Sequence, residues 1–337
     1  LGQVSSVAAD LATSRALEDF TDSAMALRDE ALEADQEDEL VDHYETEIVA
    51  PLVDLEADVT TDELVPRNES GRYLQYHYSL ADDPESVLDA GDGSEYSGTH
   101  AIWHEHFREL SDTLVFDDLK LVDASGNVVY SVAKQIDLGT NLLSGPYRDT
   151  ALAETIEDRL PRTRTGDAVM SDWEIYLPNS AQPTGFAMAL VRSGTEVLGA
   201  VIVEVPAEAL SAITTANGQW ERVGLEDGES YLVGSDSVLR SESRLWIEDP
   251  EEYLGKVDDD LLADRIRFLG SPVGIQPADT EAVRAALDGE VFEGRGSNYL
   301  GEDTFSYASL IDVEGVDWVV VADVPHDSAQ SPLYSYL

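Results

Sequence analysis

The segment Leu119-Lys-Leu-Val-Asp-Ala-Ser-Gly-Asn-Val-Val-Tyr-Ser-Val132 contains two apolar runs separated by turn residues. The turn Asp123-Ala-Ser-Gly126 lies between runs of alternating apolar residues, and this pattern predicts a β-hairpin. Two further strands are predicted over 185–191 and 197–205, joined at Ser193-Gly-Thr195, with another at 168–171. These consecutive strands predict an antiparallel sheet at the centre of the first half of the chain.

Helical patterns precede this sheet. Residues 1 to about 60 carry an apolar stripe that begins with Val4, Val7 and Leu11, and they predict a long N-terminal helix that Pro51 kinks or breaks. Tyr96, His100 and Trp103 open a second stripe that predicts a helix over 96–114. The aromatic run Tyr73–Tyr78 predicts a strand between the two helices.

The second half repeats this plan without repeating the sequence. A strand–turn–strand pattern spans 230–239, and three further strands are predicted at 291–294, 305–311 and 318–324. A helix over about 207–217 connects the two halves. Helices flanking antiparallel strands predict the α+β class.

The charge balance is extreme, with 20 basic residues against 69 acidic ones and a formal net charge of −49. Disorder is excluded because 43% of the residues are hydrophobic and runs such as 197–205 are core-like. Molar salt screens such self-repulsion, so we expect a protein adapted to high salt. The negative surface predicts no binding to nucleic acid.

Other absences narrow the class of protein. The chain has no cysteine, which excludes disulfides and thiolate nucleophiles. No run of about 18 apolar residues is found, and no hydrolase elbow, phosphate loop or zinc-protease motif is present. We therefore expect no catalysis and no cofactor, in a chain that reads as an excised part of a longer protein.

Six segments together resemble the double Cache sensor domains over roughly residues 60–325: Tyr73–Tyr78, His100–His104, Val129–Lys134, Gly145–Asp149, Asp172–Pro178 and Gly228–Ser241. The resemblance implies two PAS-like (Cache) modules, each an antiparallel sheet flanked by helices, after a long N-terminal helix. It places a helical stalk at 1–62, a membrane-distal module with the ligand pocket at 63–215, a membrane-proximal module at 216–326, and the start of a helix leading to the membrane at 327–337.

The resemblance also implies a function. Such domains lie on the extracellular side of the cell membrane in chemotaxis transducers, sensor kinases and receptor cyclases, where they bind a small-molecule ligand. It implies a homodimer through the N-terminal helices, and a cytoplasmic signalling module reached through transmembrane helices. Amino-acid sensors of this fold carry an arginine shortly before a Trp-Tyr pair. Here no arginine precedes Trp173 and Tyr176 at that place, so we expect a ligand other than an ordinary amino acid.

Lys134 is the first predicted ligand contact, because only three lysines remain in this acidic chain. The alternative is a structural ion pair with Asp137 or Asp172. His104 is predicted at the pocket edge. His100 and His104 are one helical turn apart and could share a metal, but no third ligand is evident, so no metal site is predicted.

The remaining predicted ligand contacts are aromatic or acidic. Tyr130, Tyr147, Trp173 and Tyr176 fall in the segments that wall a Cache pocket, where aromatic side chains can stack on a small organic molecule; ordinary sheet packing is the alternative. Asp172 and Glu204 complete the set. Glu204 ends an apolar strand on its core-facing side, so it should bind a cationic group or pair with an arginine.

Two other functions stay open. A free extracellular solute-binding protein would share the pocket but lack membrane-spanning segments in the full gene. A secreted hydrolase acting through carboxylates would need a deep cleft with two accessible acids of different pKa.

Overall fold

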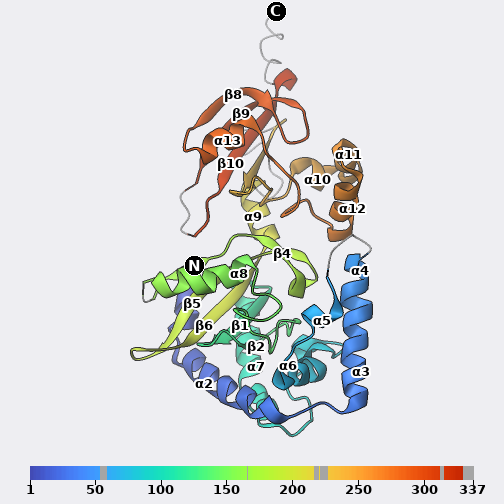
Figure 1. The fold of residues 1–337 in the computed structure, drawn as a ribbon. Helices are drawn as coiled ribbons and strands as arrows, with labels where there is room; N and C mark the ends of the chain where they lie inside the picture. Colours follow the sequence, from blue (N-terminus) through green and yellow to red (C-terminus); the bar gives the residue numbers. More distant parts are fainter. Residues whose placement is uncertain (54–58, 165, 216–219, 221–226, 312–314, 329–337) are drawn as a thin grey trace, which may run out of the picture. The chain divides into compact units, whose positions relative to one another are not determined.

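The computed structural model describes residues 1–53, 59–164, 166–215, 220, 227–311 and 315–328, in two compact units (Figure 1). The first unit comprises Leu1–Ser171, Tyr176–Ser180 and Gly185–Val205. The second comprises Asp172–Ile175, Ala181–Thr184 and Pro206–Leu337. Each unit contains an antiparallel sheet with helices packed on it, which confirms the predicted α+β class.

The sheet of the first unit has the strand order β2-β1-β6-β5-β3, with β4 paired to β5. Its strands are β1 (Asp118–Asp123), β2 (Val128–Ser131), β3 (Ala168–Met170), β4 (Glu174–Tyr176), β5 (Gln182–Ser193) and β6 (Glu196–Pro206). The predicted β1–β2 hairpin is confirmed. Its turn includes Gly126 at φ +90°, a conformation that glycine adopts without steric strain.

Two helices cover one face of this sheet. They are α2 (Leu11–Ala26) and α7 (Glu95–Leu114), and both pack on β1. The ring of Tyr130 on β2 lies 4.5 Å from that of Phe20 and 5.3 Å from that of Phe107, measured between centroids. The predicted apolar stripes therefore form the core on this side.

The N-terminal helical region is a series of helices, not one long helix. These are α1 (Gly2–Ala8), α2, η1 (Leu27–Asp29), α3 (Ala34–His43), the π-helical turn η2 (Tyr44–Val49) and α4 (Ala50–Val53). Asp10 interrupts the series because its carboxylate caps α2 at the N–H of Ala12. Pro51 is the second residue of α4, which follows the π-helical turn, so it does not end the helix.

The aromatic run Tyr73–Tyr78 is helical, and the prediction of a strand there is wrong. It lies in α6 (Glu69–Leu74) and the π-helical turn η3 (Gln75–Ser79). Gly71, Leu74, Gln75 and Tyr78 are buried, a spacing of three and four residues that matches a helix. Burial on one helical face overrides the strand preference of the aromatic residues.

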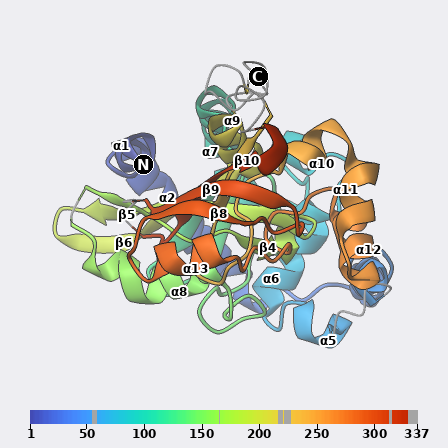
Figure 2. The ribbon, with the colours of Figure 1, turned by 90° about the horizontal axis from the view of Figure 1, so that it is seen from above.

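The second unit contains a four-stranded sheet in the order β7-β10-β9-β8. Its strands are β7 (Glu229–Val233), β8 (Phe292–Ser297), β9 (Asp303–Leu310) and β10 (Val319–Pro325). Helix α13 (Glu281–Leu287) packs on this sheet, as Figure 2 shows from above. Strands β8, β9 and β10 confirm the strands predicted at 291–294, 305–311 and 318–324.

The remaining helices are α5 (Thr61–Leu64), α8 (Ala151–Glu154), α9 (Ala207–Thr214), α10 (Arg244–Glu248), α11 (Pro250–Lys256) and α12 (Asp260–Leu269), with short turns η4 (Pro84–Ser86), η5 (Thr155–Arg159), η6 (Leu160–Arg162) and η7 (Leu177–Asn179). Within the described part of the chain, no helix is both long and apolar enough to span a bilayer. The predicted terminal helix falls mostly on residues 329–337, which lie outside the described residues.

Candidate functional site

A buried cluster of charged side chains lies on the face of the first sheet opposite α2 and α7. Lys120 Nζ lies 2.7 Å from Asp118, 2.9 Å from Asp137 and 3.3 Å from Glu204. None of these four side chains is exposed to solvent. We call Asp118, Lys120, Asp137 and Glu204 the Lys120 cluster.

The register of the sheet explains why these residues meet. Asp118 on β1 is directly opposite Glu204 on β6, and Lys120 points to the same face because side chains alternate along a strand. Two carboxylates paired across strands repel each other. Lys120 relieves this repulsion because its ammonium group lies close to both.

Hydrogen bonds fix the cluster on several sides. Asp118 accepts hydrogen bonds from the Ser131 hydroxyl at 2.7 Å and the Ala133 N–H at 2.9 Å. Gln135 accepts from Lys120 Nζ at 3.0 Å and donates to Glu204 Oε2 at 3.0 Å. Glu204 Oε1 accepts no hydrogen bond from the described residues, but it is the oxygen that lies 3.3 Å from Lys120 Nζ. Its polar contact is therefore with the ammonium group of Lys120, at a distance too long for a strong hydrogen bond.

The cluster carries more negative than positive charge, since three carboxylates surround one ammonium group. Burial raises the pKa of Glu204 to about 8, with Asp118 and Asp137 adding to the rise against the opposing effect of Lys120. Burial would also raise the pKa of Asp118, but Lys120 and the hydrogen bonds hold it below its usual range. The three carboxylates raise the pKa of Lys120 against the effect of burial. At neutral pH, Glu204 therefore holds a proton that another cation could replace.

Aromatic side chains border the cluster. The Tyr176 hydroxyl donates to Asp137 Oδ2 at 2.7 Å, and the rings of Tyr176 and Tyr147 are 6.1 Å apart. The Tyr44 hydroxyl donates to Gln75, and Gln75 donates to the carbonyl oxygens of Ile136 and Leu138. The N-terminal helical region is thereby linked to the backbone on both sides of Asp137.

Lys134 lies elsewhere, beside α7. Its Nζ is 3.3 Å from His104 Nε2 and 3.2 Å from the Val132 carbonyl oxygen. Burial lowers the pKa of Lys134 to about 7, although Asp118 and Glu85 oppose this. The ion pair with Asp137 that was considered for Lys134 is made by Lys120 instead. Lys134 also has φ +53°, an uncommon backbone conformation for a residue with a side chain.

His104 is fully buried and has a partner at each ring nitrogen: the Tyr130 hydroxyl at 2.7 Å and the Glu85 carbonyl oxygen at 2.6 Å. Burial and Lys134 lower its pKa to about 4, so the ring is neutral at neutral pH. The His100 ring stacks on it at 4.4 Å. Among the described residues, no group of three or more His, Asp or Glu side chains could hold a metal ion.

Asp172 and Trp173 belong to the second unit. Asp172 accepts two hydrogen bonds from Arg240, at 2.8 and 2.9 Å, and one from Trp318 Nε1 at 2.7 Å. The Trp173 ring packs edge-on against the Trp318 ring, with centroids 5.3 Å apart. Arg240 therefore forms a bidentate ion pair with Asp172.

The eight predicted ligand contacts thus fall into three groups. Tyr147, Tyr176 and Glu204 lie at the Lys120 cluster. His104, Tyr130 and Lys134 lie on the α7 side of the sheet, and Asp172 and Trp173 lie in the second unit. All eight are buried or half-buried, but the structure does not bring them into one site.

Sequence reasoning missed Lys120, Asp118 and Asp137 as site residues. A signal for the first two was present, because Asp118 directly precedes the strand predicted from Leu119 and lies two residues from Lys120, so both share a face once the strand includes Asp118. Asp137 follows the hairpin in a loop without regular spacing. Nothing in the sequence indicated that this loop folds back over Lys120.

The same geometry bears on the hydrolase alternative. Asp118 and Glu204 have pKa shifts in opposite directions, as a pair of catalytic acids would. Both carboxyl groups are fully buried, so a substrate, like any other ligand, could reach them only after the covering layer opens.

No family model matches the chain, and no curated protein matches it. Solved structures that it resembles include the sensor domain of the V. cholerae histidine kinase DctB, at 14% identity and a TM-score of 0.41, with 86% of this chain and 96% of that chain covered. Another is the ligand-binding domain of the Pseudomonas aeruginosa amino acid chemoreceptor PctB in complex with L-Arg, at 15% identity and 0.40, with 68% and 76% covered.

A third is the ligand-binding domain of the Pseudomonas fluorescens chemoreceptor CtaA in complex with L-alanine, at 15% identity and a TM-score of 0.39, with 64% of this chain and 76% of that chain covered. These neighbours are sensor or ligand-binding domains of signalling receptors. At such identities and TM-scores, they carry no inference about the ligand of this chain.

Proposed function

We propose that this chain is the extracellular ligand-sensing domain of a membrane signalling receptor, of the double Cache kind, and that its first unit binds a small organic molecule through a positively charged group. The observation that carries the proposal is the Lys120 cluster, in which three buried carboxylates share a single lysine. Buried carboxylates require a counter-charge or a proton, because an unpaired buried charge costs several kcal/mol.

The positively charged group of the ligand would balance the negative charge that Lys120 alone leaves on the three carboxylates. A primary ammonium group can donate to Glu204 Oε1, which has Lys120 Nζ at 3.3 Å but accepts no hydrogen bond from the described residues, and can displace the proton that the raised pKa holds on Glu204. Tyr176 and Tyr147 provide aromatic surface for the organic part of the ligand. An ammonium ligand without an arginine-bound carboxylate agrees with the absence of the arginine found in amino-acid sensors.

Burial of the cluster couples binding to movement. Since Lys120, Asp137 and Glu204 are fully covered, a ligand can reach them only when the covering layer opens. Asp137 is linked through the backbone of 136–138 and Gln75 to Tyr44 of η2. We propose that the ligand shifts the population of two arrangements of this link, and that the N-terminal helices carry the shift to the membrane.

The proposal includes a salt-rich environment. A net charge of −49 destabilises the compact state through self-repulsion, and molar salt screens it. The three lysines fit this setting because each is paired or buried: Lys120 and Lys134 in the first unit, and Lys256 between Glu252 and Glu302.

A thermal-shift screen of small organic ammonium compounds in molar KCl tests the proposal. We expect at least one compound to raise the melting temperature of the wild-type protein and of Glu196→Gln. Glu196 is a matched control, because it lies on the same strand β6 but is exposed. Glu204→Gln should lose the shift. Equal shifts in Glu204→Gln and Glu196→Gln would place the ligand elsewhere and overturn the proposal.

A further inference from the structure

A groove on the first unit is lined by arginines, in a chain where 20 basic residues face 69 acidic ones. One cavity of about 420 Å³ is lined by Arg67 and Arg148, and a second of about 270 Å³ by Arg28. Both cavities are lined by Asn68 and Asn127, so they adjoin. We call the two together the arginine groove.

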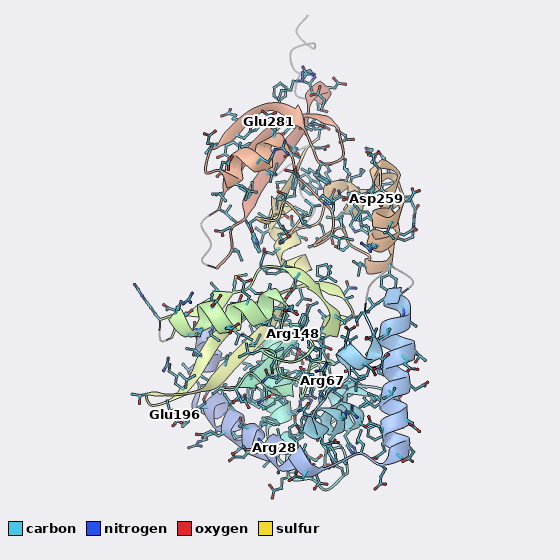
Figure 3. All side chains as sticks on the ribbon, viewed as in Figure 1. Arg28, Arg67, Arg148, Glu196, Asp259 and Glu281 are labelled. Atoms are coloured by element: carbon cyan, nitrogen blue, oxygen red, sulfur yellow. The ribbon has the colours of Figure 1, made fainter. Side chains whose placement is uncertain are left out.

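The three arginines come from separate parts of the sequence. Arg28 lies in η1, Arg67 lies just before α6, and Arg148 lies in the loop before α8; Figure 3 labels all three on the first unit. Arg28 and Arg67 form no ion pair with any residue that the structure describes. Arg148 forms an ion pair with its exposed neighbour Asp149, at 3.2 Å, and donates a hydrogen bond to the Gly145 carbonyl oxygen at 3.2 Å. An exposed contact of this kind contributes little.

The acids that line the groove are occupied by other groups. Glu63 accepts hydrogen bonds from the N–H and hydroxyl of Thr60, which cap α5. Asp123 accepts from the N–H groups of Ser125 and Asn127 and from the Asn127 side chain, which fix the β1–β2 turn. Neither carboxylate forms an ion pair with an arginine of the groove, so the guanidinium groups keep N–H donors that a ligand can use.

We propose that the arginine groove binds a small polyvalent anion, through carboxylate or phosphate oxygens held by Arg67 and Arg148 in one cavity, with Arg28 adding positive charge from the adjoining cavity. Guanidinium groups suit both kinds of oxyanion because their donors form a planar fork. A chain with a net charge of −49 repels anions in general, so local positive charge of this kind is required for any anion to bind.

This site is independent of the proposed function. Neither cavity is lined by Asp118, Lys120, Asp137 or Glu204, and the ligand has the opposite charge. The groove is built largely from the loops that follow β1 and β2 and from the connection before α6. An anion there could act as a second ligand of the same unit without competing for the Lys120 cluster.

Calorimetric titration of the whole chain with citrate and with inorganic phosphate tests the proposal, at one ionic strength set with KCl. We expect saturable binding of at least one of them, and about tenfold weaker binding in Arg67→Gln and Arg148→Gln. Arg15→Gln is the control, because Arg15 is exposed on α2 and lines neither cavity. If only citrate binds, the groove recognises carboxylate ligands. If only phosphate binds, it recognises phosphorylated ligands.

Two results would overturn the anion site. One is the absence of saturable binding for both anions. The other is equal affinity in Arg67→Gln, Arg148→Gln and Arg15→Gln, which would mean that the anion binds outside the groove. The Glu204→Gln variant should bind the anion as the wild type does, so failure of the ammonium site leaves this test unaffected. Because the substituted arginines are exposed, we expect all these variants to fold.

Discussion

The ammonium group of Lys120 lies 2.7 Å from the carboxylate of Asp118, and neither side chain is exposed to solvent. Both residues come from strand β1, two positions apart, so the alternation of the strand alone places them on one face. Strand β1 of the core therefore carries two of the four charged residues of the Lys120 cluster.

Replacing Lys120 should severely destabilise the first unit. Lys120→Met leaves Asp118, Asp137 and Glu204 buried without their cation, and removing one partner of a buried ion pair costs about 3–5 kcal/mol. Urea unfolding measures this loss. Lys256→Met is the control, because the Lys256 side chain is 32% exposed and its ion pairs should contribute about 1 kcal/mol or less. Similar losses in both variants would show that the cluster does not depend on Lys120.

Glu204→Gln should change how stability depends on pH. The folded pKa of Glu204 is about 8, above its ordinary value of 4.5, so the folded state binds the extra proton between these values. The contribution of Glu204 to stability is complete below pH 4.5. It falls between pH 4.5 and about 8, by up to about 1.4 kcal/mol per pH unit, and is lost above pH 8.

Glu204→Gln, which cannot lose a proton, should therefore match the wild type near pH 5 and exceed it in stability above pH 8. Denaturant unfolding at the two pH values measures the difference. The exposed control Glu196→Gln should follow the wild type at both. A constant difference between Glu204→Gln and the wild type would contradict the raised pKa.

Lys134→Met should have the opposite pH signature. Burial lowers the folded pKa of Lys134 to about 7 from 10.5, so the unfolded chain binds the extra proton between these values. The cost of burying charged Lys134 is complete below pH 7 and disappears as pH rises towards 10.5. Lys134→Met should therefore be more stable than the wild type at pH 6, and this advantage should shrink by pH 10. An advantage that grows with pH would refute the assignment.

Arg240→Lys should destabilise the second unit. Arg240 donates to Asp172 through two nitrogen atoms and to Asp236 through one, with only 3% of its side chain exposed. Lysine cannot reproduce a bidentate contact, so we expect a loss of about 1.5–3 kcal/mol. Thermal or urea unfolding measures it. Arg295→Lys, on the exposed Arg295–Asp303 pair, should lose far less stability, because solvent screens an exposed ion pair.

The strands of both sheets were largely predictable from the sequence because their apolar residues alternate and their turns carry glycine. The β1–β2 hairpin and the β5–β6 pair follow these rules at Gly126 and Gly194, both at positive φ. The helical Tyr73–Tyr78 run was not predictable in this way. Its aromatic residues favour strands, and only the burial of Leu74 and Tyr78 on one helical face explains its conformation.

The candidate site was less predictable than the fold. Glu204 was identifiable as an acid on the core side of an apolar strand, and the structure places it there. The scarcity of lysine predicts a specific partner for Lys134 and Lys120 alike, and the position of Lys134 at a strand end says nothing about which of the two meets the carboxylates. Asp137 joins the cluster through a loop contact that spans 17 residues to Lys120, and such contacts leave no periodic pattern in the sequence.

The central claim is that a ligand's positive group joins the carboxylates around Lys120. Nitrogen-15 NMR of the chain labelled only at lysine side chains tests it most directly, because three lysines give three Nζ signals that single substitutions assign. Saturation with an ammonium compound found by thermal shift should move the Lys120 signal and leave the Lys256 signal unchanged. A bound ligand that leaves the Lys120 signal where it was would contradict the claim.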